Sequence, residues 1–435
     1  MVIEYCRPSW PGKHSPTPRK AQKTQKRFLT PLFNQTRNGA MKHTLTLITA
    51  LLLVPLATLN AADEHNSPLW DASNPVPTVA GLATIPGARF SVIKPYEFSK
   101  DGYRFLHGVA LCHHKGKLYA SFGHNKGGEN TDTEEARWCV SEDDGQTWSE
   151  VRTIDAGAEP DIGVSHGAFL SHNGQLWAFH GAYRGIMKGV HTRAYMLNEM
   201  TGEWLPKGTV IEEGFWPMQQ PLRMENGNWI MAGLKVGSGN PAVVAISHGN
   251  DLTKWEVVVI PVASGLKMWG ESTVIVKGNE VTNISRFGAE AKALVAVSQN
   301  YGQTWSEMLP SNLPMATSKP CAGLLSTSQR YLVCTTTSDS GARRSPLTVA
   351  VTRPGQSQFS KVFVIRDAVF PDGPGESHPK ATLSYPYAIE HEGMLYVGYS
   401  NNGGNAGRIG TGRELWNNNS VELAVIPVEE LKVEP

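Results

Sequence analysis

Six polar positions recur at one point of a repeating pattern in this chain, and they are the first candidates for chemistry. Each stands about eight residues before a tight turn. The six are His107, His166, Gln219, Glu271, Lys319 with its neighbour Pro320, and Tyr385. They border apolar strands, where such polarity is unusual, and histidine can act as acid or base near neutral pH. The pattern therefore favours a site for a polar ligand.

The elements that must position these residues are six β-hairpins, each a strand, a tight turn and a second strand. They cover Leu106–Phe122, Ser165–His180, Pro217–Leu234, Gly270–Ser285, Ser318–Thr336 and Leu383–Ser400. The second strands end at another polar set, namely His124, Asn125, His180, Lys235, Arg286 and Asn401. Six hairpins closed into a ring would bring both sets to one mouth of a central channel.

A second repeat lies between the hairpins. The stretch Ser141–Trp148 reads Ser-Glu-Asp-Asp-Gly-Gln-Thr-Trp, in which Asp bonds its own backbone and Gly accepts positive φ, so a tight turn is expected. Ser298–Trp305 repeats it with Asn in place of the Asp, and weaker copies end at Trp204, Trp255 and Phe359. The five closing aromatics are 50 to 56 residues apart. At this length, such a period predicts a β-propeller.

We therefore expect an all-β fold, a six-bladed β-propeller of four-stranded antiparallel blades, forming one domain over residues 63–435. The 43 Gly and 28 Pro suit a protein rich in turns, and 40% apolar residues can supply a large core. Residues 421–426 would form the last blade's third strand, and residues 88–93 would close that blade from the N-terminal side.

The first 62 residues read as segments outside the folded domain. Residues 41–62 have a basic start, a short apolar run and small residues at the end, which indicates a signal peptide and export to the periplasm or medium. The run is short for a transmembrane span, although a membrane anchor is the alternative. Residues 1–40 are basic and Pro-dotted, and we expect Met41 to be the usual start.

Charge and cysteine content exclude several classes of partner. Residues 63–435 carry 31 basic and 38 acidic side chains, near −7, with no basic stripe for nucleic acid. Export permits disulfides among Cys112, Cys139, Cys321 and Cys334, with 321 and 334 able to face each other across one hairpin, while buried thiols are equally compatible. No spacing matches a zinc or iron–sulfur site, so we expect no metal and no cofactor.

The Asp-Gly-Gln-Thr-Trp turns resemble the Asp-boxes of the sialidase (neuraminidase) superfamily, also called BNR repeats, over most of residues 85–430. The resemblance implies a sialidase-like propeller and an exo-α-sialidase type of retaining glycoside hydrolase acting on sialoglycoconjugates or other acidic glycans. Members use a tyrosine nucleophile, an exception among glycosidases. A glutamate takes the tyrosine's proton, a loop aspartate protonates the leaving group, and three arginines bind the substrate carboxylate.

By resemblance, Tyr385 in Ser-Tyr-Pro is the nucleophile and Glu271 in Trp-Gly-Glu-Ser is its base. Asp132, in the loop before blade one's third strand, is the acid/base, with Glu129 as the alternative. A packing tyrosine, a rim ion pair and solvated loop acids are the structural alternatives to these roles.

The arginines follow the family pattern only in part. Arg286 fits the second arginine, and Arg344, with Arg343 as its alternative, fits the third. The family's Arg-Ile-Pro segment is absent, so the first arginine is either Arg104 or is replaced by His107. His107 and His166 are then expected to contact substrate, unless they are structural histidines.

Two other functions remain compatible with these residues. One is a propeller polysaccharide lyase that acts on uronate polymers through His and Tyr, which the histidine-rich mouth and the missing Arg-Ile-Pro favour. The other is a carbohydrate-binding propeller without catalysis. The identity of the acidic sugar and the oligomeric state stay open.

Overall fold

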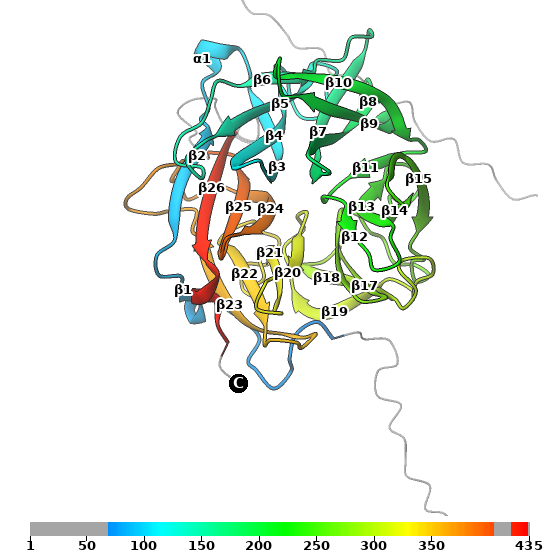
Figure 1. Ribbon diagram of the computed structural model, residues 1–435. Helices are drawn as coiled ribbons and strands as arrows, with labels where there is room; N and C mark the ends of the chain where they lie inside the picture. The colour runs from blue at the N-terminus through cyan, green and yellow to red at the C-terminus, as the bar shows by residue number, and fades with distance from the viewer. Residues whose placement is uncertain (1–67, 404–418, 434–435) are drawn as a thin grey trace, which may run out of the picture. The chain divides into compact units, whose positions relative to one another are not determined.

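The computed structural model describes residues 68–403 and 419–433, and their strands form six sheets arranged around a common centre (Figure 1). Within each sheet, strands that follow one another in sequence pair in antiparallel fashion. The fold is an all-β six-bladed propeller, as the sequence predicts. The predicted extension and signal peptide lie outside the described residues.

Three blades consist of four consecutive strands. Blade one holds β3 (Phe105–His114), β4 (Lys117–Asn125), β5 (Glu134–Ser141) and β6 (Arg152–Asp155). Blade two holds β7 (Ile162–His172), β8 (Gln175–Arg184), β9 (Lys188–Asn198) and β10 (Glu203–Ile211). Blade four holds β16 (Ser272–Lys277), β17 (Glu280–Arg286), β18 (Lys292–Ser298) and β19 (Leu309–Pro314).

Two blades carry a fifth strand. In blade three the inner strand is split into β11 (Phe215–Pro217) and β12 (Leu222–Arg223), followed by β13 (Trp229–Lys235), β14 (Ala242–His248) and β15 (Asp251–Val259). Pro217 and Pro221 account for the split, because proline cannot donate to a ladder. Blade five holds β20 (Cys321–Leu324), β21 (Arg330–Cys334), β22 (Leu347–Thr352) and β23 (Phe359–Arg366), with β1 (Ala83–Thr84) added in parallel to β23.

Blade six joins the two ends of the folded chain. It holds β24 (Leu383–His391), β25 (Met394–Asn401), β26 (Ser420–Pro427) and β2 (Arg89–Lys94). Phe90 of β2 pairs with Ala424 of β26, so the ring closes with the strand predicted from residues 88–93. β2 thus covers the edge of β26 that would otherwise be exposed.

The Asp-box turns connect the third and fourth strands of five blades, and blade six lacks one because its fourth strand comes from the N-terminal side. In the first turn, the Asp143 carboxylate accepts hydrogen bonds from Thr147 N at 2.8 Å and Thr147 Oγ1 at 2.6 Å. Asn300 accepts the equivalent bond from Thr304 N at 2.9 Å. The amide therefore replaces the carboxylate at this point of the turn.

Apolar side chains fill the spaces between neighbouring blades. Leu106, Leu111, Phe169 and Leu176, from blades one and two, belong to one buried cluster. The cysteines at 112, 139, 321 and 334 are buried free thiols, and Cys321 pairs across its hairpin with Val333 rather than Cys334. Burial raises the pKa of the Cys334 thiol to about 12.

Helix is a minor component of residues 68–403 and 419–433: the short α1 (Phe98–Asp101), η1 (Val79–Gly81) and η3 (Val428–Leu431). Within this described part, no helix has the length and apolar content needed to cross a membrane.

The first Asp-box turn makes a testable contribution to stability. Hydrogen bonds from Thr147 and Ser141 hold the pKa of Asp143 at about 2, below its ordinary 3.8. Asp143→Ala should lower the melting temperature by about 1–3 °C at pH 7, whereas Asp143→Asn should lower it less, since Asn300 makes the same turn.

The stabilisation from this depressed pKa is present above pH 3.8 and disappears as the pH falls through about 2. Calorimetry of wild type and Asp143→Ala should therefore show the difference in melting temperature shrinking between pH 4 and pH 2. An equal difference at both ends of that range would contradict the role given to the carboxylate.

Candidate active site

A cavity of about 500 Å³ lies at the mouth where the inner strands begin. Its wall includes residues within the first five positions of β3, β7 and β24 and the residue that precedes β16. The side chains used below are His107, Glu129, Glu134, Ser165, His166, Trp216, Trp269, Glu271, Arg286, Arg344 and Tyr385. His107 and Tyr385, which are 278 positions apart in the chain, thus share one small space, as the closed ring predicts.

Three inner strands are irregular at this mouth. The pairing of β3, β7 and β24 with their neighbours shifts register between His107 and Ala110, Val164 and Gly167, and Ser384 and Tyr387. Such bulges turn side chains away from the regular alternation and are common beside active sites. Tyr385 has a φ of +53°, which a bulky residue adopts only when its surroundings impose it. The first residues of these three strands therefore have an irregular backbone that directs side chains into the cavity.

Tyr385, Glu271 and Arg286 form one connected group in the cavity wall. The Tyr385 hydroxyl donates a short hydrogen bond to Glu271 Oε1. Arg286 Nη1 pairs with Glu271 Oε2 at 2.8 Å, and Trp269 Nε1 donates to Oε1 at 3.1 Å. Glu271 is only 3% exposed, so the arginine and the two donors compensate for burying its charge.

The electrostatics of this group keep the tyrosine protonated at rest. Burial, and next to it the Glu271 carboxylate, raises the pKa of Tyr385 well above 10, while Arg286 and Arg344 oppose the rise. Burial is the largest single influence on the pKa of Arg286 and lowers it, but the charges of Glu271 and Tyr385 and the hydrogen bond to Glu271 together outweigh burial, so the net pKa is raised. The phenol can thus attack only if its proton passes to a base, and Glu271 is already bonded to it.

The arginines predicted from sequence separate into two groups. Arg344 lies in the cavity wall with its guanidinium carbon 5.7 Å from the Tyr385 ring centroid, and its Nη2 donates to Thr317 O at 3.0 Å. Arg343 is exposed and turned to Asp339 O and Ser340 O. Arg104 is also exposed, 4.7 Å from the Phe98 ring, and does not line the cavity.

His107 lies in the wall of the cavity, at the mouth where the repeat of the six hairpins predicted it. Its ring centroid lies 3.6 Å from that of Tyr385, and neither ring nitrogen has a hydrogen-bond partner in the described part of the chain. Its Nε2 is 4.0 Å from Glu129 Oε1. Burial, followed by the charges of His166 and Arg344, lowers the pKa of His107 well below 6.5, so the ring is neutral.

His166 lines the cavity next to these groups. Its ring lies edge-on to Tyr385, with 5.7 Å between the centroids, and its carbonyl accepts a bond from Trp216 Nε1 at 3.2 Å. Burial, followed by the charge of Lys319, lowers the pKa of His166 to about 3.

The loop before β5 contributes to the wall through residues other than the predicted acid. Glu129 and Asn130 line the cavity, whereas Asp132 is exposed and does not. Two of the six first-strand positions also lie elsewhere. The Gln219 amide bridges Val274 and Ala322, and Lys319 is buried with its ammonium on Pro386 O at 3.0 Å.

Sequence reasoning missed one buried acid in the wall, Glu134. It is 1% exposed and accepts hydrogen bonds from Tyr183 Oη, at 2.6 Å, and from Ser165 Oγ. Glu134 shares a strand face with Ala136 and Trp138, and an acid in such an apolar series is a signal that could have identified it.

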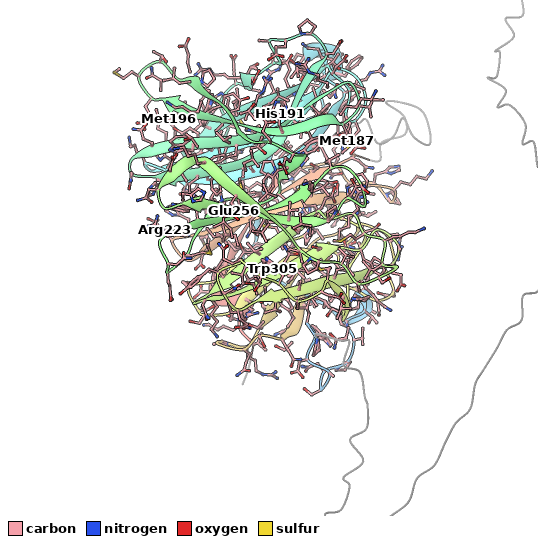
Figure 2. All side chains as sticks on the ribbon, turned by 90° about the vertical axis from the view of Figure 1, so that its right-hand side faces the viewer. Met187, His191, Met196, Arg223, Glu256 and Trp305 are labelled. Carbon is pink, nitrogen blue, oxygen red and sulfur yellow. The ribbon has the colours of Figure 1, made fainter. Side chains whose placement is uncertain are left out.

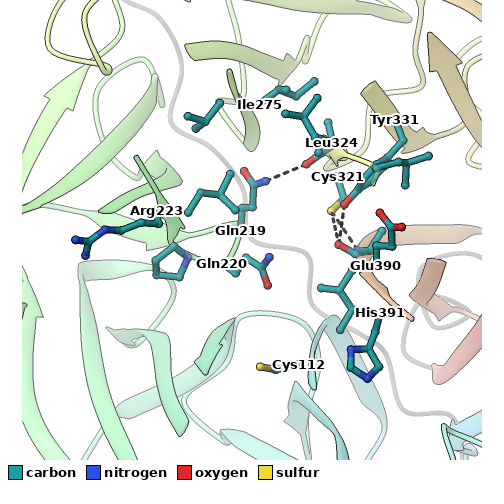
Figure 3. Close-up of a pocket in the computed structure, with 18 of the residues that line it drawn as sticks. Cys112, Gln219, Gln220, Arg223, Ile275, Cys321, Leu324, Tyr331, Glu390 and His391 are labelled. Carbon is teal, nitrogen blue, oxygen red and sulfur yellow. Dashed lines mark hydrogen bonds between the residues drawn. The ribbon is translucent and has the colours of Figure 1, made fainter. Parts of the chain in front are cut away.

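A larger cavity of about 1100 Å³ lies at the opposite mouth, where the inner strands end (Figure 3). In the side view, Met187 of the smaller cavity and Arg223 of the larger one lie toward opposite faces of the propeller (Figure 2). Of the six first-strand candidates only Gln219 lines the larger cavity, which contains none of the residues given a catalytic or substrate-binding role by resemblance, and its Glu390 is bonded to Ser326. We therefore place the candidate active site in the smaller cavity.

Within the described residues, no group of three or more His, Cys, Asp or Glu side chains is arranged to hold a metal ion. The chemistry that the residues themselves offer is proton transfer between Tyr385 and Glu271, together with anion binding by Arg286 and Arg344.

The buried ion pair at Glu271 should be visible in stability measurements. Arg286→Met leaves the carboxylate buried without its cation and should cost about 3–5 kcal/mol in the free energy of unfolding. The double variant Glu271→Gln with Arg286→Met should cost less than Arg286→Met alone, because no unpaired charge remains. Denaturant unfolding of the single and double variants provides the measurement, and additive costs would contradict the coupling.

Comparisons with known proteins agree with this architecture. The model of the BNR repeat-like domain family matches residues 167–397. No curated protein matches the chain. A protein of unknown function from Dyadobacter fermentans is similar in structure, with a TM-score of 0.59 and 16% identity, over 79% of this chain and all of that one.

Two sialidases have the same degree of structural similarity. The Hadza microbial sialidase Hz136 has a TM-score of 0.59 at 12% identity, over 78% of this chain and 68% of its own. The NanB sialidase from Streptococcus pneumoniae has a TM-score of 0.59 at 11% identity, over 78% and 71%. At these identities the similarity concerns the fold. By its family match, the chain belongs to the BNR repeat-like domain family.

Proposed function

We propose that this protein is a retaining glycoside hydrolase that releases a terminal acidic sugar from glycans, with sialic acid as the default substrate. The observation that supports this most strongly is the hydrogen bond from Tyr385 to Glu271, whose other oxygen is paired with Arg286. A tyrosine in a cavity wall whose hydroxyl is hydrogen-bonded to a glutamate can act as a nucleophile, because the glutamate can accept its proton during the attack.

The proposed reaction has two steps. First, Tyr385 Oη attacks the anomeric carbon, its proton passes to Glu271, and the bond to the leaving oxygen breaks as that oxygen takes up a proton. Water then attacks the same carbon and gives a proton to the group that protonated the leaving oxygen. The bond to Tyr385 breaks, and Tyr385 regains its proton from Glu271. Two displacements at one carbon retain its configuration.

A substrate with a carboxylate at the reacting carbon fits the charges of the wall. Arg286 and Arg344 can both donate charge-assisted hydrogen bonds to that carboxylate. His107 is the candidate that replaces the missing first arginine, and as a neutral ring it offers a hydrogen bond but no charge. We expect a weaker grip on the carboxylate than three arginines would give, and a site that also admits other acidic sugars.

The names of the structural relatives and the predicted signal peptide also support this proposal. Two of the structural relatives are named as sialidases, and the segment 41–62 is predicted to direct export. An exported enzyme would meet glycoconjugates outside the cell, as the proposed substrate requires.

Elimination on a uronate polymer is the second candidate, and one observation favours it. His107 has two unpartnered ring nitrogens beside the Tyr385 ring, so a histidine and a tyrosine could handle a proton next to a carboxylate. Hydrolysis is preferred because the Tyr385 hydroxyl is already bonded to Glu271.

Replacement of the nucleophile gives the direct test. Tyr385→Phe should lower kcat/KM on an aryl sialoside by at least roughly 10³-fold, because no oxygen remains to attack. Tyr387→Phe is the matched control, since Tyr387 lies two residues away and lines the opposite cavity, and it should retain activity. Release of the free aryl alcohol provides the readout.

Other results would point to the alternatives. A new conjugated double bond in products from a uronate polymer would indicate elimination in place of hydrolysis. Glycan binding that survives both Tyr385→Phe and Glu271→Ala, without turnover of sialosides or uronate polymers by wild type, would indicate a binding protein.

The adjacent pair Arg343 and Arg344 allows a matched test of carboxylate binding. Arg344→Met should raise KM roughly 10- to 100-fold, corresponding to a lost hydrogen bond to a charged group. Arg343→Met should leave KM within about 2-fold, because this side chain lies outside the cavity wall. Steady-state kinetics on the same sialoside would decide, and equal effects of the two changes would argue against a specific contact.

A further inference from the structure

The proposed reaction requires a donor for the proton that the leaving oxygen takes up, and Asp132 lies outside the cavity wall. We propose that Glu134 supplies this proton through Ser165 and His166, so that His166 Nε2 delivers it to the leaving oxygen. The proposal rests on the function proposed above and adds the acid/base of that site.

The three side chains form a continuous path that ends in the cavity. Ser165 Oγ is hydrogen-bonded to Glu134 Oε1 and lies 3.1 Å from His166 Nδ1. The other ring nitrogen, His166 Nε2, is buried and has no partner in the described part of the chain. All three residues line the cavity, and the His166 ring is 5.7 Å from that of Tyr385.

Two glycines make room for this path. A Cβ at Gly123 would lie 2.2 Å from Glu134 Oε1 and 3.0 Å from Ser165 Oγ. A Cβ at Gly108, whose φ is +65°, would lie 2.2 Å from the His166 ring. A side chain at either position would displace the groups that carry the proton.

The path can move a proton without making a cation. With Glu134 protonated, its hydrogen bond with Ser165 is reversed, so that Glu134 donates to Ser165 Oγ and Ser165 donates to His166 Nδ1. When Nε2–H gives its proton to the leaving oxygen, Nδ1 takes one from Ser165 Oγ, and Ser165 takes one from Glu134. The products are an alcohol, a neutral imidazole with its hydrogen on Nδ1, and the Glu134 carboxylate. In the second step, the attacking water loses its proton to Nε2, and the same transfers run backward to Glu134.

The surroundings of the path favour the neutral forms of both His166 and Glu134. Burial raises the pKa of Glu134 to about 7, although bonds from Ser165 and Tyr183 oppose the rise. The charged or titratable groups around the path are Glu129, Tyr183, His107, His180, Lys319 and Tyr385. Since burial and Lys319 disfavour imidazolium at His166, exchange between its two neutral forms is the accessible route.

Glu129 is the competing acid, because it also lines the cavity and belongs to the loop where the resemblance places the acid/base. Its side chain is 51% exposed and directed toward His107, whereas Glu134 is directly bonded into the path. The experiments below compare the two acids.

The first experiment follows the ring nitrogens and needs no turnover. In ¹⁵N-labelled wild-type protein, with the His166 signals assigned through His166→Gln, the hydrogen should move from Nε2 to Nδ1 as the pH rises through about 7. Glu134→Gln and Ser165→Ala should abolish this exchange. A cationic His166 in this range, or an exchange that persists in Glu134→Gln, would overturn the proposal.

The second experiment varies the leaving group. A 4-nitrophenol leaving group departs without protonation, whereas a sugar alcohol needs an acid. Glu134→Gln, Ser165→Ala and His166→Gln should each lower kcat/KM on a sialosyl-sugar by roughly 100-fold or more, yet lower it less than about 5-fold on the 4-nitrophenyl sialoside. Tyr183→Phe keeps the path but removes a donor from the carboxylate, so the alkaline fall in activity, near pH 7 in wild type, should move to higher pH.

The two experiments separate the failure of each proposal. Glu129→Gln or Asp132→Asn, instead of Glu134→Gln, could be the variant that lowers kcat/KM on the sialosyl-sugar but not on the 4-nitrophenyl sialoside. That result would show that the proposed proton path is wrong, and it would leave the proposed hydrolase activity supported. Inactivity of wild type on both substrates would overturn the hydrolase, while tautomer exchange abolished by Glu134→Gln would still support proton passage from Glu134 to His166.

Discussion

A carboxylate buried in the wall of the smaller cavity is the constraint on which the site depends. Glu271 is shielded from water, and an unpaired charge in such a place is strongly unfavourable. Its compensation comes from an arginine of the same blade, a tyrosine of blade six and a tryptophan of the segment between blades three and four. The charge therefore ties two blades together across the channel, and it can do so only while the ring is closed.

The architecture was largely predictable because its causes are local. The Asp-Gly turns, the hairpin turns and the apolar strands each act over a few residues, and their repetition identifies the ring. The closure of β2 on β26 followed from a requirement to leave no free edge, and Phe90 and Ala424 meet as that argument implies. The short β1 beside β23 had no such signal, since two residues carry no period.

The candidate site was predictable only where the register is regular. Glu271 and Arg286 face each other through the register of one hairpin, and they could be read from the sequence. The bulges in β3, β7 and β24 each insert extra residues and break the regular alternation of side chains between the two faces of the strand. The alternation in the sequence therefore does not predict which side chain near a bulge points into the cavity. Glu134 was missed for a different reason: its role comes from Ser165 and Tyr183 in the next blade, contacts that no pattern within one blade contains.

The joining of β2 to β26 has a consequence for how the molecule is made. During synthesis from the amino end, β2 emerges more than 300 residues before its partner exists. Blade six is the last unit to be completed, and the cavity, which uses Tyr385 from that blade, is assembled at the same moment. A nascent chain thus carries an unpartnered strand, and lacks the complete cavity, until β26 has been synthesised.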